Sequence, residues 1–258
     1  MSLQACAELV ERGDADRFLA TMTAPPEARA RLFPLYAFNL EVARAPWTSQ
    51  EPMIAEMRLQ FWHDTIDDIG AGRGPGAHEV ARELAGVIEA ASLPVAQMAG
   101  LVAARRWDIY REPFTDQAHF DRYIDETSGN LMWLAARALG AGSTAEPMIR
   151  DVAYAAGVAN WLRAVPELEA RGRIPLIDGR PEGVFTLASG ALARLQAATR
   201  AGPGVGRETA FALRPGWQAE IILKRAVNEP ERVSQGSLGT SEFRRRVGLL
   251  WVSALGRW

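Results

Sequence analysis

The sequence predicts an all-α protein built as a helical bundle. Most segments between proline- and glycine-rich breaks carry apolar residues three and four positions apart, which is the spacing of one helix face. No segment shows the alternation typical of strands, and no unit repeats at a fixed period. With 258 residues, 48% of them hydrophobic, the chain can bury a large core, and we expect a single domain over residues 1–258.

Charge and composition exclude several classes of protein. The net charge is −2, whereas nucleic-acid binders normally carry a basic surplus, so we expect no nucleic-acid partner. The single cysteine, Cys6, allows no internal disulfide and fits a reducing compartment, and one cysteine with three scattered histidines offers no zinc-ligand spacing. No apolar run approaches the roughly 20 residues that span a bilayer, and the N-terminus lacks a signal-peptide core. We therefore expect a cytoplasmic protein with no transmembrane segment.

Prolines, glycines and capping residues divide the first half of the chain into helices. Residues 3–22 should form one helix or two with a break near Gly13, and the next helix should open at Pro25 and Pro26, kink or break at Pro34 and end at Pro46. Further helices are expected over residues 52–69, 78–91, 94–111 and 117–139. The helix over 52–69 has an apolar stripe made of Ile54, Met57, Phe61, Trp62, Ile66 and Ile69.

In the second half, a long helix should begin near Thr144, followed by helices over 183–200 and 213–227. Residues 201–206 read as a flexible link, and residues 228–240 as an exposed loop. Ser241 should cap a last helix, which is basic and amphipathic. Its apolar side could touch anionic lipid or a partner, or it could pack on the protein's own core.

The stretch Gly157–Ile177 has the composition of a pocket wall. Small and amide side chains share one helix face, because residues three and four apart are neighbours there: Ala153, Gly157, Asn160 and Ala164. Arg163, Arg171 and Arg173 surround the end of this helix. The combination predicts a wall for a long or anionic ligand. The alternative is a tightly packed core helix followed by a solvated basic turn.

This stretch also resembles the second signature motif of squalene and phytoene synthases. The matching residues are Asn160, Leu162, Arg163, Val165, Glu167, Arg171, Gly172, Arg173, Ile174 and Leu176. Upstream, Arg31–Phe38 is similar to the family's entry to its first signature, and Phe61–Trp62, Asp108, Tyr123 and Gly129 fit later segments. The resemblance covers most of residues 17–177. It implies an isoprenoid-synthase-type helical bundle around a central cavity.

The aspartates of both signatures are missing. In active members they hold magnesium ions against an allylic diphosphate, and magnesium prefers oxygen ligands in octahedral geometry. Here these degenerate positions hold Ala43, Arg44, Trp47, Ala164 and Leu168. We therefore expect no metal site, no cofactor and no catalytic residues of the usual kind, hence a pseudoenzyme.

Other acids are candidate replacements for the lost aspartates. Asp64, Asp67 and Asp68 form one cluster, and Asp121 and Asp125 lie one helical turn apart. Both groups are more typical of a solvated helix surface than of a metal site. Glu41 and Glu167 are the acids nearest the degenerate signatures, but neither replaces a cluster.

A narrower resemblance concerns a divergent branch of the family that includes a mitochondrial assembly factor for respiratory complex I. It rests on Ala37–Ala43, Met57–Trp62 and Leu162–Pro166. It implies a protein that acts in assembly or stability of a membrane respiratory complex, with a place at the surface of the inner membrane and an isoprenoid-like lipid in the old cavity. A lipid carrier is a related reading. The alternative is an active head-to-head prenyl transferase that uses unusual acids and magnesium.

The ligand-binding candidates come from both signatures: Tyr36, Phe38, Asn160, Arg163, Arg171 and Arg173. Arginine suits a phosphate or carboxylate head group. The alternative is that these arginines form ion pairs with Glu167 and Glu169. Trp47 or Trp161 could plug the cavity entrance.

Overall fold

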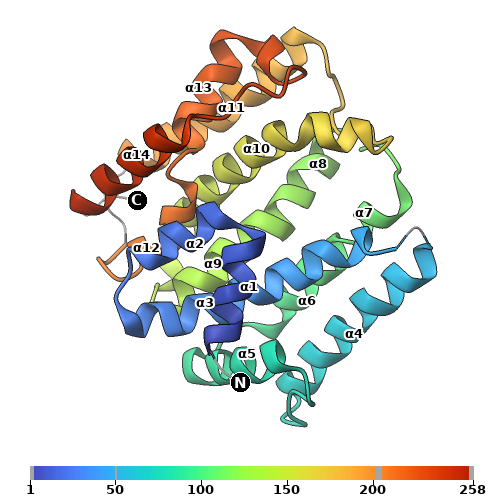
Figure 1. The fold of residues 1–258 in the computed structure, drawn as a ribbon, viewed down its shortest axis with the longest axis vertical. Coiled ribbons are helices and arrows are strands. Elements are labelled where there is room, and N and C mark those ends of the chain that lie inside the picture. Colours follow the sequence, from blue (N-terminus) through green and yellow to red (C-terminus); the bar gives the residue numbers. More distant parts are fainter. Residues whose placement is uncertain (1–2, 50, 201–204, 256–258) are drawn as a thin grey trace.

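The protein is described by a computed structural model that covers residues 3–49, 51–200 and 205–255, and within them every regular element is helical (Figure 1). The N-terminal half contains α1 (Leu3–Gly13), α2 (Ala15–Met22), α3 (Pro26–Arg44), η1 (Ala45–Trp47), α4 (Pro52–Gly70), α5 (Glu79–Ala91), α6 (Val95–Ala104) and α7 (Trp107–Tyr110). The second half contains α8 (Gln117–Ile124), η2 (Asp125–Gly129), α9 (Asn130–Ala138), η3 (Ser143–Ala145), α10 (Glu146–Ala170), α11 (Pro181–Arg200), α12 (Ala210–Leu213), η4 (Arg214–Gly216), α13 (Ala219–Asn228), η5 (Pro230–Arg232) and α14 (Glu242–Ala254). The predicted all-α class is confirmed.

Side-chain caps fix the starts of three helices. Asp14 accepts a hydrogen bond from the backbone N–H of Arg17 at 2.9 Å and opens α2, so the chain breaks after Gly13 as expected. Asp116 caps α8 in the same way, and Ser241 caps α14, as predicted. Such caps satisfy backbone donors that have no partner within the helix.

The helices α3 and α10 run through the interior. From Leu32 to Leu40 every residue of α3 is buried, which explains why this helix is apolar nearly all round. The helix passes Pro34 without interruption and ends at Arg44, two residues before the expected end at Pro46. In Figure 1, α10 crosses the centre of the molecule, with α1 to α3 on one side and α11, α13 and α14 on the other.

The predicted apolar stripe of α4 is only half right. Trp62 and Ile66 are buried, but Ile54, Met57 and Phe61 are 38%, 66% and 46% exposed. The buried face instead follows Ala55, Leu59, Trp62 and Ile66. The predicted stripe combines two sides of α4 that are about 100° apart: Ile54, Met57 and Phe61 on one, Trp62 and Ile66 on the other. The packing of α4 against its neighbours, α6 among them, covers only the second side.

Three other expectations need correction. The segment 94–111 breaks at Arg105 into α6 and α7, and the segment 117–139 is interrupted by the π-helical turn η2. The segment 213–227 breaks at η4, where Pro215 cannot supply a backbone N–H.

The expected loop at 228–240 is also more ordered than predicted, because it buries Val233 and Leu238. Of the expected link at 201–206, residues 201–204 lie outside the described part. No helix in the described ranges combines the length and the apolar character needed to cross a bilayer.

Candidate functional site

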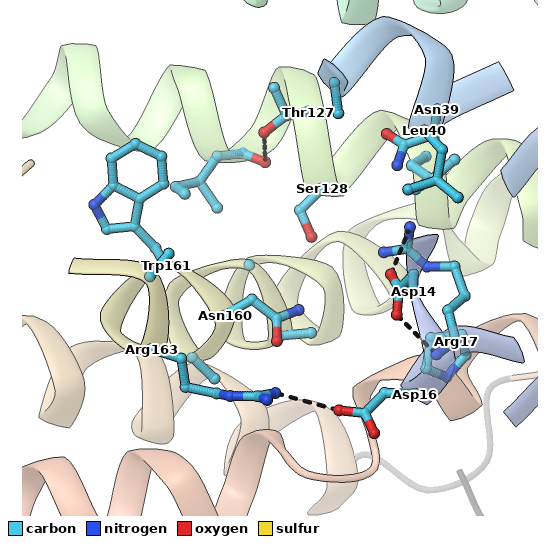
Figure 2. A pocket seen from close by; sticks show the side chains of 18 of the residues that line it. Asp14, Asp16, Arg17, Asn39, Leu40, Thr127, Ser128, Asn160, Trp161 and Arg163 are labelled. Atoms are coloured by element: carbon cyan, nitrogen blue, oxygen red, sulfur yellow. Dashed lines mark hydrogen bonds and ion pairs between the residues drawn. The ribbon is translucent and has the colours of Figure 1, made fainter. Parts of the chain in front are cut away.

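A cavity of about 680 Å³ lies between α3 and α10 and is completed by α2, the α8–η2 segment and the η4–α13 segment. Its size falls within the range of roughly 300–1,000 Å³ that is usual for small-molecule sites. Figure 2 shows Asn39 and Leu40 of α3, Thr127 and Ser128 of η2, and Asn160 of α10 around this space. The two predicted signature helices therefore do face a common cavity.

All five degenerate signature positions line this cavity. Ala43, Arg44 and Trp47 come from α3 and η1, and Ala164 and Leu168 come from α10. Residues that are 117 to 125 positions apart in the sequence are thus brought to one site. None of the five side chains offers an oxygen atom to a cation.

The carboxylates that do line the cavity are already held by arginines. Within the lining, Asp14 pairs with Arg17 at 3.3 Å and Glu167 with Arg171 at 2.5 Å.

Asp16 is the most heavily engaged of these acids. It pairs with Arg163 at 3.4 Å (dashed in Figure 2) and with Arg245 at 2.9 Å, and it accepts a hydrogen bond from Gln218 at 2.8 Å. A magnesium ion would have to displace these guanidinium groups. The residues present therefore do not fit a magnesium–diphosphate site, and no group of three His, Cys, Asp or Glu side chains in the described ranges could hold a metal ion.

The alternative acids lie away from this cavity. Asp68 pairs with Arg73 at 2.7 Å and Asp125 with Arg150 at 2.9 Å, while Asp121 accepts the hydroxyl hydrogen of Tyr154 at 2.5 Å. Asp64, Asp67 and Glu41 are likewise not among the residues described as lining the cavity. The structure does not bring these acids together as a substitute metal centre.

A buried polar cluster closes one end of the cavity. The hydroxyl of Tyr123 donates to the Asp108 carboxylate at 3.0 Å, and Arg105 Nη1 donates to the Tyr123 hydroxyl at 2.9 Å and to Asp108 at 3.3 Å. Burial raises the pKa of Asp108, and the charge of Arg105 and the hydrogen bond from Tyr123 oppose that rise. The cluster joins α7 to α8 and leaves a charge-balanced wall.

Trp47 packs against the arginines of the basic turn that follows α10. The guanidinium carbons of Arg171 and Arg173 lie 4.8 and 5.0 Å from the centre of the Trp47 ring, within cation–π range. Arg173 is 5% exposed, donates to the backbone carbonyl of Trp107 at 3.3 Å and does not line the cavity as described. Thus a tryptophan at an acid position packs against two of the arginines that we considered as ligand-binding residues.

The other predicted ligand-binding residues divide into two groups. Tyr36 and Phe38 are 1% and 0% exposed and belong to the core rather than to the described lining of the cavity. Arg163 and Asn160 do line it. In the described chain, the carboxamide of Asn160 has no hydrogen-bond partner, whereas Arg163 is paired with Asp16. Neither Glu167 nor Glu169 is the partner of Arg163.

The small face of α10 allows a close helix contact. A Cβ atom on Gly157 would lie 2.7 Å from Ile124 Cγ2 and 2.8 Å from Ser128 Cβ. Ser128 Oγ donates to the backbone carbonyl of Ala153 at 2.8 Å. The π-helical turn η2 therefore packs directly on α10, and π-helical turns occur frequently at functional sites. On this face Gly157 therefore packs closely against η2, while Asn160 and Ala164 line the cavity.

Sequence reasoning missed several residues of the site. Asn39 lines the cavity, is 6% exposed and, within the described chain, has a carboxamide without a hydrogen-bond partner. The sequence feature that could have identified Asn39 is its position as a polar residue within the apolar run Leu32–Leu40. Asp16 and Arg245 come from segments outside the quoted motifs, and only the fold places them here.

The family model for squalene/phytoene synthase matches residues 10–176 of the chain. Among solved structures, a dehydrosqualene synthase in complex with ligand is similar with a TM-score of 0.80 and 16% sequence identity, covering 98% of this chain and 95% of that chain. The squalene synthase HpnC from Alicyclobacillus acidocaldarius gives a TM-score of 0.64 and 17% identity, covering 98% and 94%. At these identities the structural likeness shows the fold alone.

Relatives with a higher identity carry a different name. The chain is 33% identical over 181 residues to the NADH dehydrogenase (ubiquinone) complex I, assembly factor 6 homolog of Drosophila melanogaster, covering 67% of this chain and 53% of that protein. It is 29% identical over 171 residues to complex I assembly factor 6 of Bos taurus and 28% identical to that of Homo sapiens, covering 66% of this chain and 51% of each. The chain spans about half the length of these curated relatives.

Proposed function

Because the chain belongs to the squalene/phytoene synthase family, we propose that it is a member without prenyl transferase activity that acts in assembly or stability of a membrane respiratory complex. One observation carries the loss of the family chemistry. All five signature positions line a single cavity without one carboxylate among them, and each carboxylate in the lining is paired with an arginine. The cavity lies between the two helices that carry the signature positions, and these positions lack the acids that would bind a metal ion.

The assembly role is supported by the names of the relatives. Several proteins 28–33% identical over about two thirds of this chain are named as complex I assembly factor 6 or its homolog. Such a role places the protein at the surface of the membrane that holds the complex. The partner would be a subunit or another assembly protein of that complex.

The cavity supports a second part of the proposal, the binding of a long apolar molecule with a polar or anionic head. Trp47 and Trp161 both line the cavity but do not fill it, since about 680 Å³ remains open. An open cavity of this size is typical of ligand sites. The side chain of Trp161 is held at the cavity wall, because its Nε1 donates a hydrogen bond to the backbone carbonyl of Pro175 at 2.9 Å.

Three side chains are suited to receive the head group. Asn39 and Asn160 approach from opposite helices; Asn39 is buried and Asn160 is exposed, and neither carboxamide has a hydrogen-bond partner within the described chain. Arg44 lines the cavity and makes no ion pair with another residue of the described chain. Its cation stands where the family carries an acid, so a head group can be held directly rather than through a metal ion.

Native mass spectrometry of protein purified without detergent tests the ligand. We expect bound lipid in the wild type and less in the variants Asn160→Leu and Arg44→Gln. Asn228→Leu changes an exposed asparagine of α13 and serves as the matched control. A wild type without lipid would remove the ligand from the proposal and leave a role through surface contacts.

Calorimetry separates this proposal from the prenyl transferase alternative. Farnesyl or geranylgeranyl diphosphate analogues should show no magnesium-dependent binding. Micromolar binding that requires magnesium and is lost in Glu167→Gln would favour the enzyme.

Affinity purification from membranes tests the assembly role directly. Subunits of a respiratory complex should be recovered with the tagged protein, and a deletion strain should contain less of the assembled complex. Normal levels of every respiratory complex in that strain would refute the role.

A further inference from the structure

The C-terminal helix α14 presents large apolar side chains to solvent. Phe243, Leu250, Trp251 and Leu255 at its end are 76%, 68%, 64% and 54% exposed. Of the 13 residues of α14, only Leu249 is buried. Isolated exposed apolar residues are common, but a group on one helix usually marks an interaction surface.

These side chains make up one broad side of the helix. Phe243 and Leu250 are seven residues apart, hence two turns along the same line, and Trp251 and Leu255, four apart, lie about 100° further round. The opposite side holds the helix on the protein through Leu249 and through Arg245, which pairs with Asp16 of α2 at 2.9 Å. Because Leu249 and Arg245 hold the inner side of α14 on the protein, its apolar side faces solvent.

The charges of α14 point to the kind of surface that covers it. Arg244 and Arg246 are exposed. Arg246 borders the apolar face next to Leu250, and Arg244, seven residues before Trp251, lies at the start of the helix on the same side as Trp251. The helix contains three arginines and one glutamate, Glu242, which pairs with Arg246 at 2.6 Å. Exposed phenylalanine, leucine and tryptophan side chains together with arginines on the same helix are typical of helices that lie in the interface of an anionic bilayer. A helix of 13 residues is about 20 Å long and can lie flat there but cannot span.

We propose that α14 docks the protein on an anionic membrane surface, with Phe243, Leu250 and Trp251 inserted among the lipids and Arg244 and Arg246 at the head groups. The inner face of the same helix contributes Arg245 to the lining of the cavity. Docking therefore brings the cavity next to the bilayer. This binding does not depend on the assembly role.

Vesicle co-sedimentation of the full chain tests the proposal. The wild type should bind phosphatidylcholine vesicles that contain phosphatidylglycerol and bind pure phosphatidylcholine vesicles much less. The triple variant F243S/L250S/W251S should lose at least about tenfold in partitioning, because apolar insertion supplies the short-range attraction. The variant R244Q/R246Q should lose about tenfold on anionic vesicles only.

The chain offers a matched control on another face. Met53 and Met57 of α4 are 73% and 66% exposed, so M53S/M57S removes exposed apolar side chains away from α14. This variant should bind vesicles as the wild type does. Equal losses in both apolar variants would overturn the proposal, as would a wild type that does not bind anionic vesicles. A wild-type dimer that the triple variant converts to a monomer, without vesicle binding in either, would show that a second copy covers α14 instead.

Discussion

Asp16 of α2 pairs with Arg245 of α14, 229 residues further along the chain, with 2.9 Å between Oδ1 and Nη1. The same carboxylate pairs with Arg163 of α10, so it joins three helices at the cavity. Its side chain is 18% exposed, which limits screening by solvent.

Asp16→Asn should therefore destabilise the protein by about 1–2 kcal/mol, since two guanidinium groups lose their counter-charge. Urea denaturation measures the change. Glu8→Gln is the control, because Glu8 pairs with Arg12 at 3.9 Å on the surface and should contribute close to zero. Equal effects in both variants would show that Asp16 is no more than a surface charge.

The same substitution at two helical glycines should have opposite signs. A Cβ on Gly157 would overlap Ile124 and Ser128, so Gly157→Ala should cost about 1–3 kcal/mol. A Cβ on Gly190 of α11 meets nothing within 4 Å, so Gly190→Ala should stabilise by about 0.5–1 kcal/mol through helix propensity. Thermal unfolding of both variants checks the pair. A neutral Gly157→Ala would mean that η2 can move away from α10.

Removing Asp108 leaves Arg105 without its counter-charge. The two side chains are 3% and 19% exposed, and breaking a buried pair by removing one partner costs about 3–5 kcal/mol. Asp108→Asn should approach this loss, while Tyr123→Phe, which keeps the ion pair, should cost about 1–2 kcal/mol. Denaturant titration gives both values, and the reverse order would contradict the assigned network.

The thiol of Cys6 should make stability fall at alkaline pH. Burial first, and then the charges of Glu83 and Glu79, raise the pKa of Cys6 to about 12. An unfolded thiol ionises near pH 8.5, so between about pH 9 and 12 the unfolded state binds fewer protons and unfolding becomes easier. Cys6→Ala should show a shallower decline over this range than the wild type in unfolding experiments. Identical slopes would mean that the thiol ionises normally in the folded protein.

Restoring acids to the cavity should restore a metal site. The variant A43D/R44D/W47D/A164D/L168D should show a rise of a few degrees in Tm when magnesium and inorganic diphosphate are added together. The variant A164D/L168D has only one half of the site and should gain little. The wild type should not respond. A wild-type response would show that the present side chains bind the metal–diphosphate complex.

The sequence by itself determined the helical class, because local apolar spacing and the cap at Ser241 are properties of neighbouring residues. The sequence also determined that the five positions at which the family carries aspartates hold no carboxylate, because this needs only a comparison of the motifs. That Asn160 lines a cavity followed from the small face of its helix.

The tertiary structure alone decided which residues complete the site and which apolar faces stay uncovered. Met57 and Phe61 resemble a core stripe in sequence but remain exposed, because no other helix covers that side of α4 within the described chain. Asp16, Asn39 and Arg245 meet at the cavity from distant segments. The periodicity of a sequence shows which sides of a helix are apolar. The packing of elements far apart in the chain decides which of these sides are buried.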